Sequence, residues 1–171
     1  MDVWGAHVPL SWWTVAALLV GAAPSVPLWR PLARWRGWRR RWTLIAWISL
    51  VVVLSLTLTP GDDLHHTGLR ECIPRTLPDL RRSVLHTGGG IVADGLNVLL
   101  TVPVTLSMVM ATRRLLPALL ISPLLPLTVE LTQTLIPGRV CAVSDLVANT
   151  IGGLLGAAIG WGLNRRRRPR R

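Results

Sequence analysis

Long apolar blocks separated by short polar segments are the feature that most constrains how this chain folds. An α-helix of about 20 residues crosses a hydrocarbon core of ~30 Å, because it rises ~1.5 Å per residue. The sequence therefore predicts an all-α fold: a polytopic membrane protein with a bundle of five transmembrane helices, forming a single integral membrane domain over residues 1–171. The five predicted transmembrane helices are residues 11–29, 42–59, 91–111, 115–136 and 145–163.

Prolines interrupt two of these blocks. Pro24 and Pro27 predict a kink in the second half of the first block, because proline cannot donate the backbone hydrogen bond that a helix interior needs. The fourth block contains three prolines, so we expect it to be bent, with neighbouring helices satisfying the freed carbonyls.

Arginine supplies all 19 basic residues, and its distribution predicts the orientation of the helices. The segments after the first and third blocks, together with the C-terminal tail, hold 14 arginines, whereas the alternate segments hold five. Positively charged segments stay in the cytoplasm. We therefore predict a multi-pass protein of the cell membrane with its N-terminus outside, an extracytoplasmic loop at residues 60–90 and a basic cytoplasmic tail at residues 164–171.

The formal net charge of +11 raises the question of nucleic acid as a partner. The arginines gather at the ends of apolar blocks, and no recognition helix or aromatic stacking platform interleaves with them. Membrane lipid, through the anionic surface of the inner leaflet, is therefore the favoured partner, and no nucleic-acid binding is predicted.

The two cysteines, Cys72 and Cys141, both fall in segments that this orientation places outside the cell. Disulfides form and persist in such oxidising compartments. We therefore predict a disulfide that holds the long loop over the helix ends, with two unpaired thiols on one side of the membrane as the alternative.

Polar residues inside the apolar blocks are costly, and they usually face the bundle interior or a water-filled cavity. The predicted orientation puts them near the extracytoplasmic ends of the third, fourth and fifth blocks, which predicts a polar pocket open to that side. The candidate pocket comprises Asp94, Asn97, Glu130, Gln133, Arg139, Asp145 and Asn149.

Each residue of this candidate pocket also has a structural interpretation. The two aspartates could cap helix N-termini, and the three amides could hydrogen bond between helices. Glu130 and Arg139 could form a structural ion pair. Glu130 is the strongest functional candidate, because an ionisable group about six residues from its helix end lies ~9 Å deep.

Gly152, Gly156 and Gly160 follow one another at intervals of four residues in the last block. Such a stripe of small residues permits close packing of two helices. Packing within the bundle is the favoured use, and a homo-oligomer is the alternative.

The long loop carries a group of acids and histidines that could bind a divalent cation. The group lacks a known ligand spacing such as His-Glu-x-x-His, so a solvated acidic loop is the favoured interpretation. No phosphate-binding loop, dinucleotide glycine pattern or serine-elbow motif occurs, and no metal or cofactor is predicted. The group comprises Asp62, Asp63, His65, His66 and Glu71.

The run from Glu130 to Gly160 resembles the C-terminal signature of the VanZ-like membrane protein family, in which a Glu and a Gln three apart precede an Arg-containing turn, an Asp, an Asn and a glycine-rich helix. The segment DGLNVLLTVP is similar to the family's Asp-x-x-Asn helix, and LTLTPGD and ECIP are similar to two earlier motifs. The resemblance covers roughly residues 44–162. The chain departs from the family's pattern at Thr101, Thr105 and Pro126, where an aromatic residue, a glycine and a serine are common.

This resemblance implies a role in the bacterial cell envelope, because the family includes a protein associated with low-level resistance to the glycopeptide teicoplanin. Two functions remain open. The outward-facing pocket could bind an envelope lipid, a cell-wall peptide precursor or a lipoglycopeptide antibiotic. Alternatively, the chain could be an outer-leaflet enzyme that acts on a lipid-linked envelope substrate, with Glu130 or Asp94 as general acid or base.

Overall fold

The computed structural model describes residues 2–3, 6–7, 11–60, 76–79, 81, 90–139 and 141–166. Two short antiparallel strands, β1 (Asp2–Val3) and β2 (Ala6–His7), lie near the N-terminus, and the remaining named elements are α-helices. The predicted all-α membrane fold is confirmed, because four helices are long and apolar enough to cross a membrane. These four helices are α3 (Arg40–Thr57), α6 (Gly90–Thr112), α7 (Leu116–Gln133) and α8 (Val143–Arg166).

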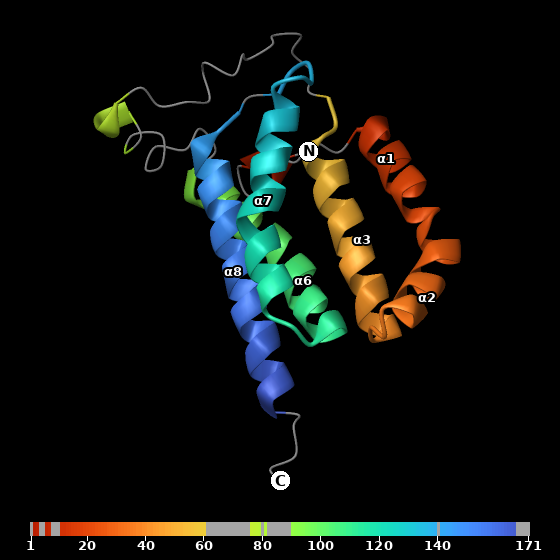
Figure 1. The fold of residues 1–171 in the computed structure, drawn as a ribbon. Helices are drawn as coiled ribbons and strands as arrows, with labels where there is room; N and C mark the ends of the chain where they lie inside the picture. Colours follow the sequence, from red (N-terminus) through yellow and green to blue (C-terminus); the bar gives the residue numbers. More distant parts are fainter. Residues whose placement is uncertain are drawn as a thin grey trace.

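The first apolar block is the one that differs from its prediction. It does not form a single helix over residues 11–29, but two helices of 11 residues each, α1 (Trp12–Ala22) and α2 (Ser25–Trp35). Figure 1 shows α1 and α2 following one another along one side of the bundle. The apolar helix α1 alone is too short for a core of ~30 Å, and α2 extends into the segment that was expected to be a basic loop.

The break between α1 and α2 has a physical cause. Pro24 cannot donate a backbone hydrogen bond to the preceding turn, so the helix ends there. The carbonyl of Gly21 accepts a hydrogen bond of 3.1 Å from the indole of Trp47 on α3. The neighbouring helix therefore satisfies a carbonyl at the break, and the expected kink becomes a complete interruption.

The other four blocks correspond to α3, α6, α7 and α8, whose ends differ from the predicted limits by three residues or fewer. The helix α7 ends earlier than expected because the chain turns through Pro137 and Gly138, where glycine adopts a φ of 71°. Most of the predicted loop at residues 60–90, and residues 167–171 of the tail, lie outside the described residues.

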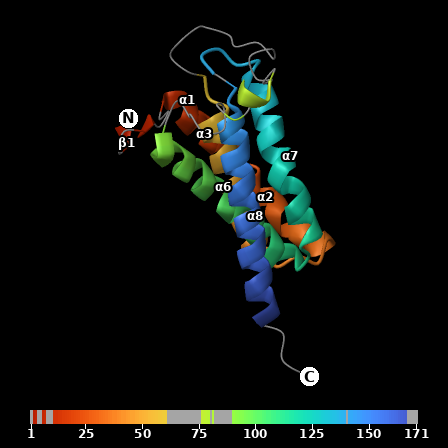
Figure 2. The ribbon, with the colours of Figure 1, turned by 90° about the vertical axis from the view of Figure 1, so that its left-hand side faces the viewer.

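The helices α6 and α8 run in the same direction and make the largest contact in the bundle. Figures 1 and 2 show that both begin at one end of the molecule and descend together toward the other. The helix α7 connects the end of α6 to the start of α8, runs in the opposite direction to both, and packs on α8. The helix α3 packs on α6, and α1 and α2 pack on α3. As a result, α6 and α8 begin where α3 and α7 end.

Glycines let α6 and α8 approach closely. A side-chain carbon at Gly152 would overlap the carbonyl of Val98, and one at Gly156 would overlap the carbonyl of Val102. Gly160 continues the same contact one turn further along α8. The glycine stripe therefore packs inside the bundle, where backbone meets backbone.

Two threonines of α6 bind the backbone of α8 across this contact. The hydroxyl of Thr101 donates to the carbonyl of Asn149 at 2.8 Å, and that of Thr105 donates to the carbonyl of Gly153 at 2.7 Å. Both pairs are separated by 48 residues, so one register holds along the helices. Thr101 and Thr105 are two of the positions at which the chain departs from the family's pattern, and here they join the helices.

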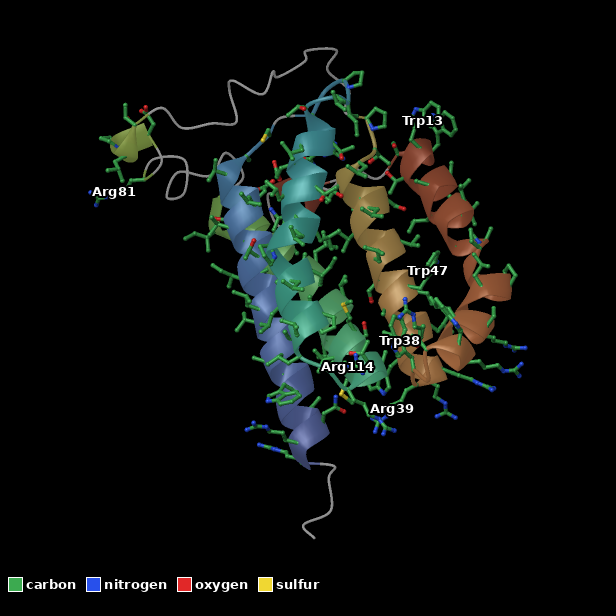
Figure 3. All side chains as sticks on the ribbon, viewed as in Figure 1. Trp13, Trp38, Arg39, Trp47, Arg81 and Arg114 are labelled. Carbon is green, nitrogen blue, oxygen red and sulfur yellow. The ribbon has the colours of Figure 1, made fainter. Side chains whose placement is uncertain are left out.

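The end of the bundle at which α6 and α8 finish is basic. Figure 3 shows Arg39 and Arg114 at the end where α8 finishes, and Trp13 at the other end. The amide of Asn164, near the end of α8, donates to the carbonyl of Val109 on α6 at 2.9 Å. The turn between α2 and α3, the turn between α6 and α7, and the end of α8 therefore bring their arginines to one side.

Candidate functional site

The seven residues of the candidate pocket lie at the end of the bundle opposite these arginines, because α6 and α8 begin there and α7 ends there (Figure 1). They divide into two groups according to the helices on which they lie and the groups that they contact. The group on α7 and the following turn is called the turn anchor and comprises Glu130, Gln133 and Arg139. The group on α6 and α8 contains Asn97, Asn149 and two aspartates, Asp94 and Asp145, which are called the acid pair.

Arg139 of the turn anchor binds the end of α3. Its Nε donates to the carbonyl of Thr59 at 2.6 Å, and its Nη2 donates to the carbonyl of Leu56 at 2.9 Å. The last carbonyls of a helix lack partners within the helix and form the negative end of its dipole, so a guanidinium satisfies them and neutralises their partial charge. Arg139 therefore fixes the α7–α8 turn on α3.

The environment of Arg139 includes a second helix and a nearby acid. Its Nη2 also contacts the hydroxyl of Thr59 at 3.2 Å, and that hydroxyl lies 3.4 Å from the hydroxyl of Thr14 on α1. Burial lowers the pKa of the Arg139 guanidinium below its ordinary value, and the nearby carboxylate of Asp145 opposes this shift. Arg139 thus links α1, α3 and the first turn of α8.

Glu130 is almost completely buried, with 4 % of its surface exposed. Its Oε2 accepts a hydrogen bond of 2.9 Å from the backbone N–H of Ala142, the residue before α8. A carboxylate at this place satisfies one of the backbone donors that a helix N-terminus leaves free. The contact gives Glu130 a defined structural role at the start of α8.

Only the NH₂ group of the Gln133 amide contacts the end of α3. Its Nε2 donates to the carbonyl of Thr57, the last residue of α3, at 2.9 Å. Its Oε1 is buried and has no hydrogen-bond partner among the described residues. The side chain is 7 % exposed, so this oxygen is an unsatisfied acceptor inside the protein.

Asp145 is the centre of the charged residues. Its carboxylate interacts electrostatically with Asp94 and Arg139, the hydroxyl of Ser144 lies 3.5 Å from its Oδ1, and the amide of Asn97 lies near it. Glu130 also interacts with it through charge. Asp145 and Asn97 are 48 residues apart, so they continue the register set by the threonines. The acid pair is therefore formed by facing turns of α6 and α8.

Asn149 lies one helical turn below Asp145 on the same face of α8. Its side chain is 5 % exposed, and its Oδ1 has no hydrogen-bond partner in the described part of the chain. The same is true of one carboxylate oxygen of the acid pair, Oδ1 of Asp94. Three buried acceptor oxygens at this end of the bundle, one each on α6, α7 and α8, thus have no partner within the described ranges.

An apolar groove with a volume of about 310 Å³ lies on a different part of the surface. None of the seven candidate residues, which are together called the polar cluster, lines this groove. The groove is therefore separate from the polar cluster. Its lining residues are Pro123, Leu127, Leu146, Val147, Thr150 and Ile151.

The predictions for the long loop fall on residues that are not described. Cys141 lies half-buried before α8, and the described residues include no free cysteine. Its predicted partner Cys72 lies outside the described residues, so the disulfide stays a prediction. The loop acids and histidines, from Asp62 to Glu71, lie outside them as well.

Several partners in this region were not identified from the sequence. Thr59 and Thr14 connect α3 and α1 to Arg139, and Thr101 connects α6 to Asn149. Thr59 stands in the segment LTLTPGD, which resembles a family motif but does not by itself identify Thr59 as a site residue. Its position directly before a proline–glycine turn was the available signal that its carbonyl would need an external donor.

Comparison with known proteins identifies the family of the chain. The sequence model of the family described as VanZ/LLP1 matches residues 42–164, from the first turn of α3 to the last turns of α8. No curated protein and no solved structure matches the chain. The matched segment contains all four long apolar helices and all seven residues of the polar cluster. The chain is therefore a multi-pass membrane protein that belongs to the VanZ/LLP1 family.

Proposed function

We propose that this chain is a protein of the bacterial cell membrane whose polar cluster faces outward and binds an envelope lipid, a cell-wall peptide precursor or a lipoglycopeptide antibiotic. Through this binding it contributes to resistance against antibiotics of the teicoplanin type. The three unsatisfied oxygens of Asp94, Gln133 and Asn149 carry the proposal. Buried acceptors are normally satisfied by protein, ordered water or a ligand.

The positions of the arginines support the outward orientation of the cluster. Ten arginines between Arg30 and Arg166 belong to the junctions and helix end at the pole opposite the cluster. If the positive-inside rule applies, that pole is cytoplasmic and the cluster lies at the extracytoplasmic surface. A reporter fused after Arg171 should then be active only in the cytoplasm, and an extracytoplasmic signal would contradict the orientation.

Antibiotic susceptibility tests the function. Expression of the chain in a susceptible host should raise the inhibitory concentration of teicoplanin more than that of a glycopeptide without a lipid tail. The variant Asp94→Asn, which removes a charge from the acid pair, should lose most of this effect. Asp79→Asn is the matched control, because Asp79 lies in the loop and its described contact is with Thr76.

The result depends on equal amounts of protein in the membrane, which immunoblotting of each variant measures. Unchanged susceptibility on expression of the wild-type chain would refute the resistance role. Equal effects of Asp94→Asn and Asp79→Asn would refute the role of the acid pair.

The predicted disulfide between Cys72 and Cys141 would tie the long loop to the cluster at its extracytoplasmic end. Mass mapping of the natively produced protein without reduction should recover the two cysteine peptides as one linked species. Recovery of both cysteines as free thiols would remove this part of the proposal.

Enzymatic turnover of a lipid-linked substrate is the second candidate function, and the closeness of two carboxylates in the acid pair favours it. Asp94 is a better general acid or base than Glu130, because Oε2 of Glu130 already binds the N–H of Ala142. Glu130→Gln tests whether Glu130 itself acts as the acid or base. Glutamine can still accept that hydrogen bond, so a binding protein should tolerate the variant better than Glu130→Ala, whereas an enzyme that uses this proton should not.

A further inference from the structure

The chemistry of the polar cluster narrows the class of ligand, and this inference rests on the proposed binding function. Three buried side-chain atoms lack partners among the described residues, and all three are oxygens. One is a carboxylate oxygen and two are amide oxygens, so all three accept hydrogen bonds as they stand. A complementary ligand group must therefore donate hydrogen bonds.

The charges around the cluster also favour a cation. Asp94, Asp145 and Glu130 are three acids that interact through Asp145, and Arg139 is the one base that the same interactions include. A phosphate or carboxylate group would meet three acids on entry. A positively charged group would instead relieve the repulsion within the acid pair.

Two donors of the turn anchor are engaged elsewhere, while the hydroxyl of Ser144 lies 3.5 Å from Oδ1 of Asp145. Arg139 donates to the end of α3, and Nε2 of Gln133 donates to the carbonyl of Thr57. The amide of Asn97 lies near Asp145, and Oδ1 of Asp94 has no partner among the described residues. Arg139 and Gln133 thus use their donors to hold the helices, whereas Asp94, Gln133 and Asn149 each keep a buried acceptor oxygen without a partner among the described residues.

We propose that the acid pair, with the amide oxygen of Asn149 one helical turn from Asp145, binds a primary ammonium group. An ammonium carries one positive charge and three N–H donors and has no acceptor, which matches this set of groups. A hard metal ion such as Ca²⁺ takes six to eight oxygen ligands, and no three acids, histidines or cysteines of the described residues are grouped so that they could hold a metal ion. The ammonium can belong to an ethanolamine lipid headgroup or to an amine of a soluble peptide.

A pair of lipids tests the proposal directly. Phosphatidylethanolamine and phosphatidylcholine have the same phosphodiester and the same net charge, but only the first has N–H donors. The full chain, purified into nanodiscs of phosphatidylglycerol that contain equal amounts of both lipids, should retain phosphatidylethanolamine about tenfold over phosphatidylcholine in native mass spectrometry. This ratio corresponds to about 1.4 kcal/mol.

The source of the ammonium is tested with a soluble peptide. A lysine-containing pentapeptide and its Nε-acetylated form, both with acetylated N-termini, differ in one ammonium group. If only the free amine competes with the lipid, the site accepts soluble amines. If neither peptide competes but phosphatidylethanolamine is still selected, the ammonium comes from lipid.

Variants connect the selectivity to the acid pair. Asp94→Asn and Asp145→Asn should each bring the lipid ratio close to one, whereas Asp79→Asn should leave it unchanged. Thermal unfolding of each variant verifies that it is folded. The proposal would be overturned if the wild-type chain retained both lipids equally and the free-amine peptide did not compete. It would also be overturned if the selectivity survived both variants, or if Ca²⁺ but neither ammonium compound stabilised the protein against thermal unfolding.

These measurements contain no antibiotic, so they separate this inference from the proposed function. Ammonium selectivity without any change in teicoplanin susceptibility would contradict the resistance role only. A susceptibility phenotype that depends on Asp94, without ammonium selectivity, would contradict the ammonium proposal only.

Discussion

The turn anchor and the acid pair lie at the same end of one bundle, yet their polar groups have different partners. Glu130, Gln133 and Arg139 bind backbone groups at the start of α8 and the end of α3. Asp94 and Asp145 face each other across α6 and α8, and one oxygen of Asp94 has no partner among the described residues. Burial alone therefore does not identify a functional residue in this protein.

The two regions also differ in what holds their helices together. The polar side chains of the turn anchor are themselves the connection between α7, α8 and α3. The helices that carry the acid pair are joined instead by the glycine stripe and by Thr101 and Thr105. We infer that the backbone contacts of the turn anchor are required for stability, whereas the acid pair and the buried oxygens without partners among the described residues are available for a ligand.

Gly156→Leu should have the largest effect on stability. Its side chain would overlap the carbonyl of Val102, which belongs to the backbone and cannot rotate away. We expect the folded state to lose about 3 kcal/mol or more, measured by unfolding in mixed detergent micelles. Gly162→Leu is the matched control on the same helix, because nothing lies within 4 Å of a side-chain carbon at Gly162. Equal loss in both variants would disprove the close α6–α8 contact.

Arg139→Ala should have the next largest effect, a loss of about 3 kcal/mol in the same assay, because it leaves carbonyls of Leu56 and Thr59 without a donor. Arg139→Lys should recover only part of this loss, since an ammonium cannot reproduce the fork of a guanidinium. Wild-type stability of Arg139→Ala would show that the turn anchor does not fasten α3.

Glu130→Ala should cost about 1–2 kcal/mol, because the N–H of Ala142 loses its acceptor. Glu130→Gln should cost less than about 1 kcal/mol, because the amide oxygen can accept the same hydrogen bond. The informative quantity is the loss of unfolding free energy in Glu130→Gln compared with the loss in Glu130→Ala. If the glutamine variant is as unstable as the alanine variant, the charge of Glu130 contributes to the fold and not only its oxygen.

Asp94→Asn should change stability least, by no more than about 0.5 kcal/mol in either direction, because Asp94 has an unpartnered oxygen and faces a second acid. The same variant should have the largest effect on ligand selectivity. A loss of stability comparable with that of Arg139→Ala would place Asp94 among the structural residues and remove the distinction between the two regions.

Much of the fold was predictable because the membrane imposes helix length and composition on the sequence. The limits of α3, α6, α7 and α8 follow from apolar blocks bounded by arginine or by proline–glycine turns. The first block was predicted incorrectly as one helix, since its apolar content gave no sign that Trp47 would stabilise a break at Gly21. That contact comes from a helix more than 20 residues away in sequence.

The candidate site was predictable at the level of which residues gather at one end. Helix direction alone brings the starts of α6 and α8 to the end of α7. The division into two groups was not predictable, because it depends on backbone carbonyls of Leu56, Thr57 and Thr59. A carbonyl has no sequence signature, and only the packing of α3 against the turn shows which side chain satisfies it.

The regular spacing of the α6–α8 contact has a consequence for its alignment. Sliding α8 by one turn would bring Thr101 opposite the carbonyl of Gly153 and would place Gly156 where Gly152 was. It would also put Ala157 where Gly153 was, and a side-chain carbon there lies 2.8 Å from the hydroxyl of Ser122. The two ends also disfavour this slide, because Asn97 would lose Asp145 and Asn164 would lose the carbonyl of Val109. The two asparagines at opposite ends therefore select the same alignment as the glycines between them.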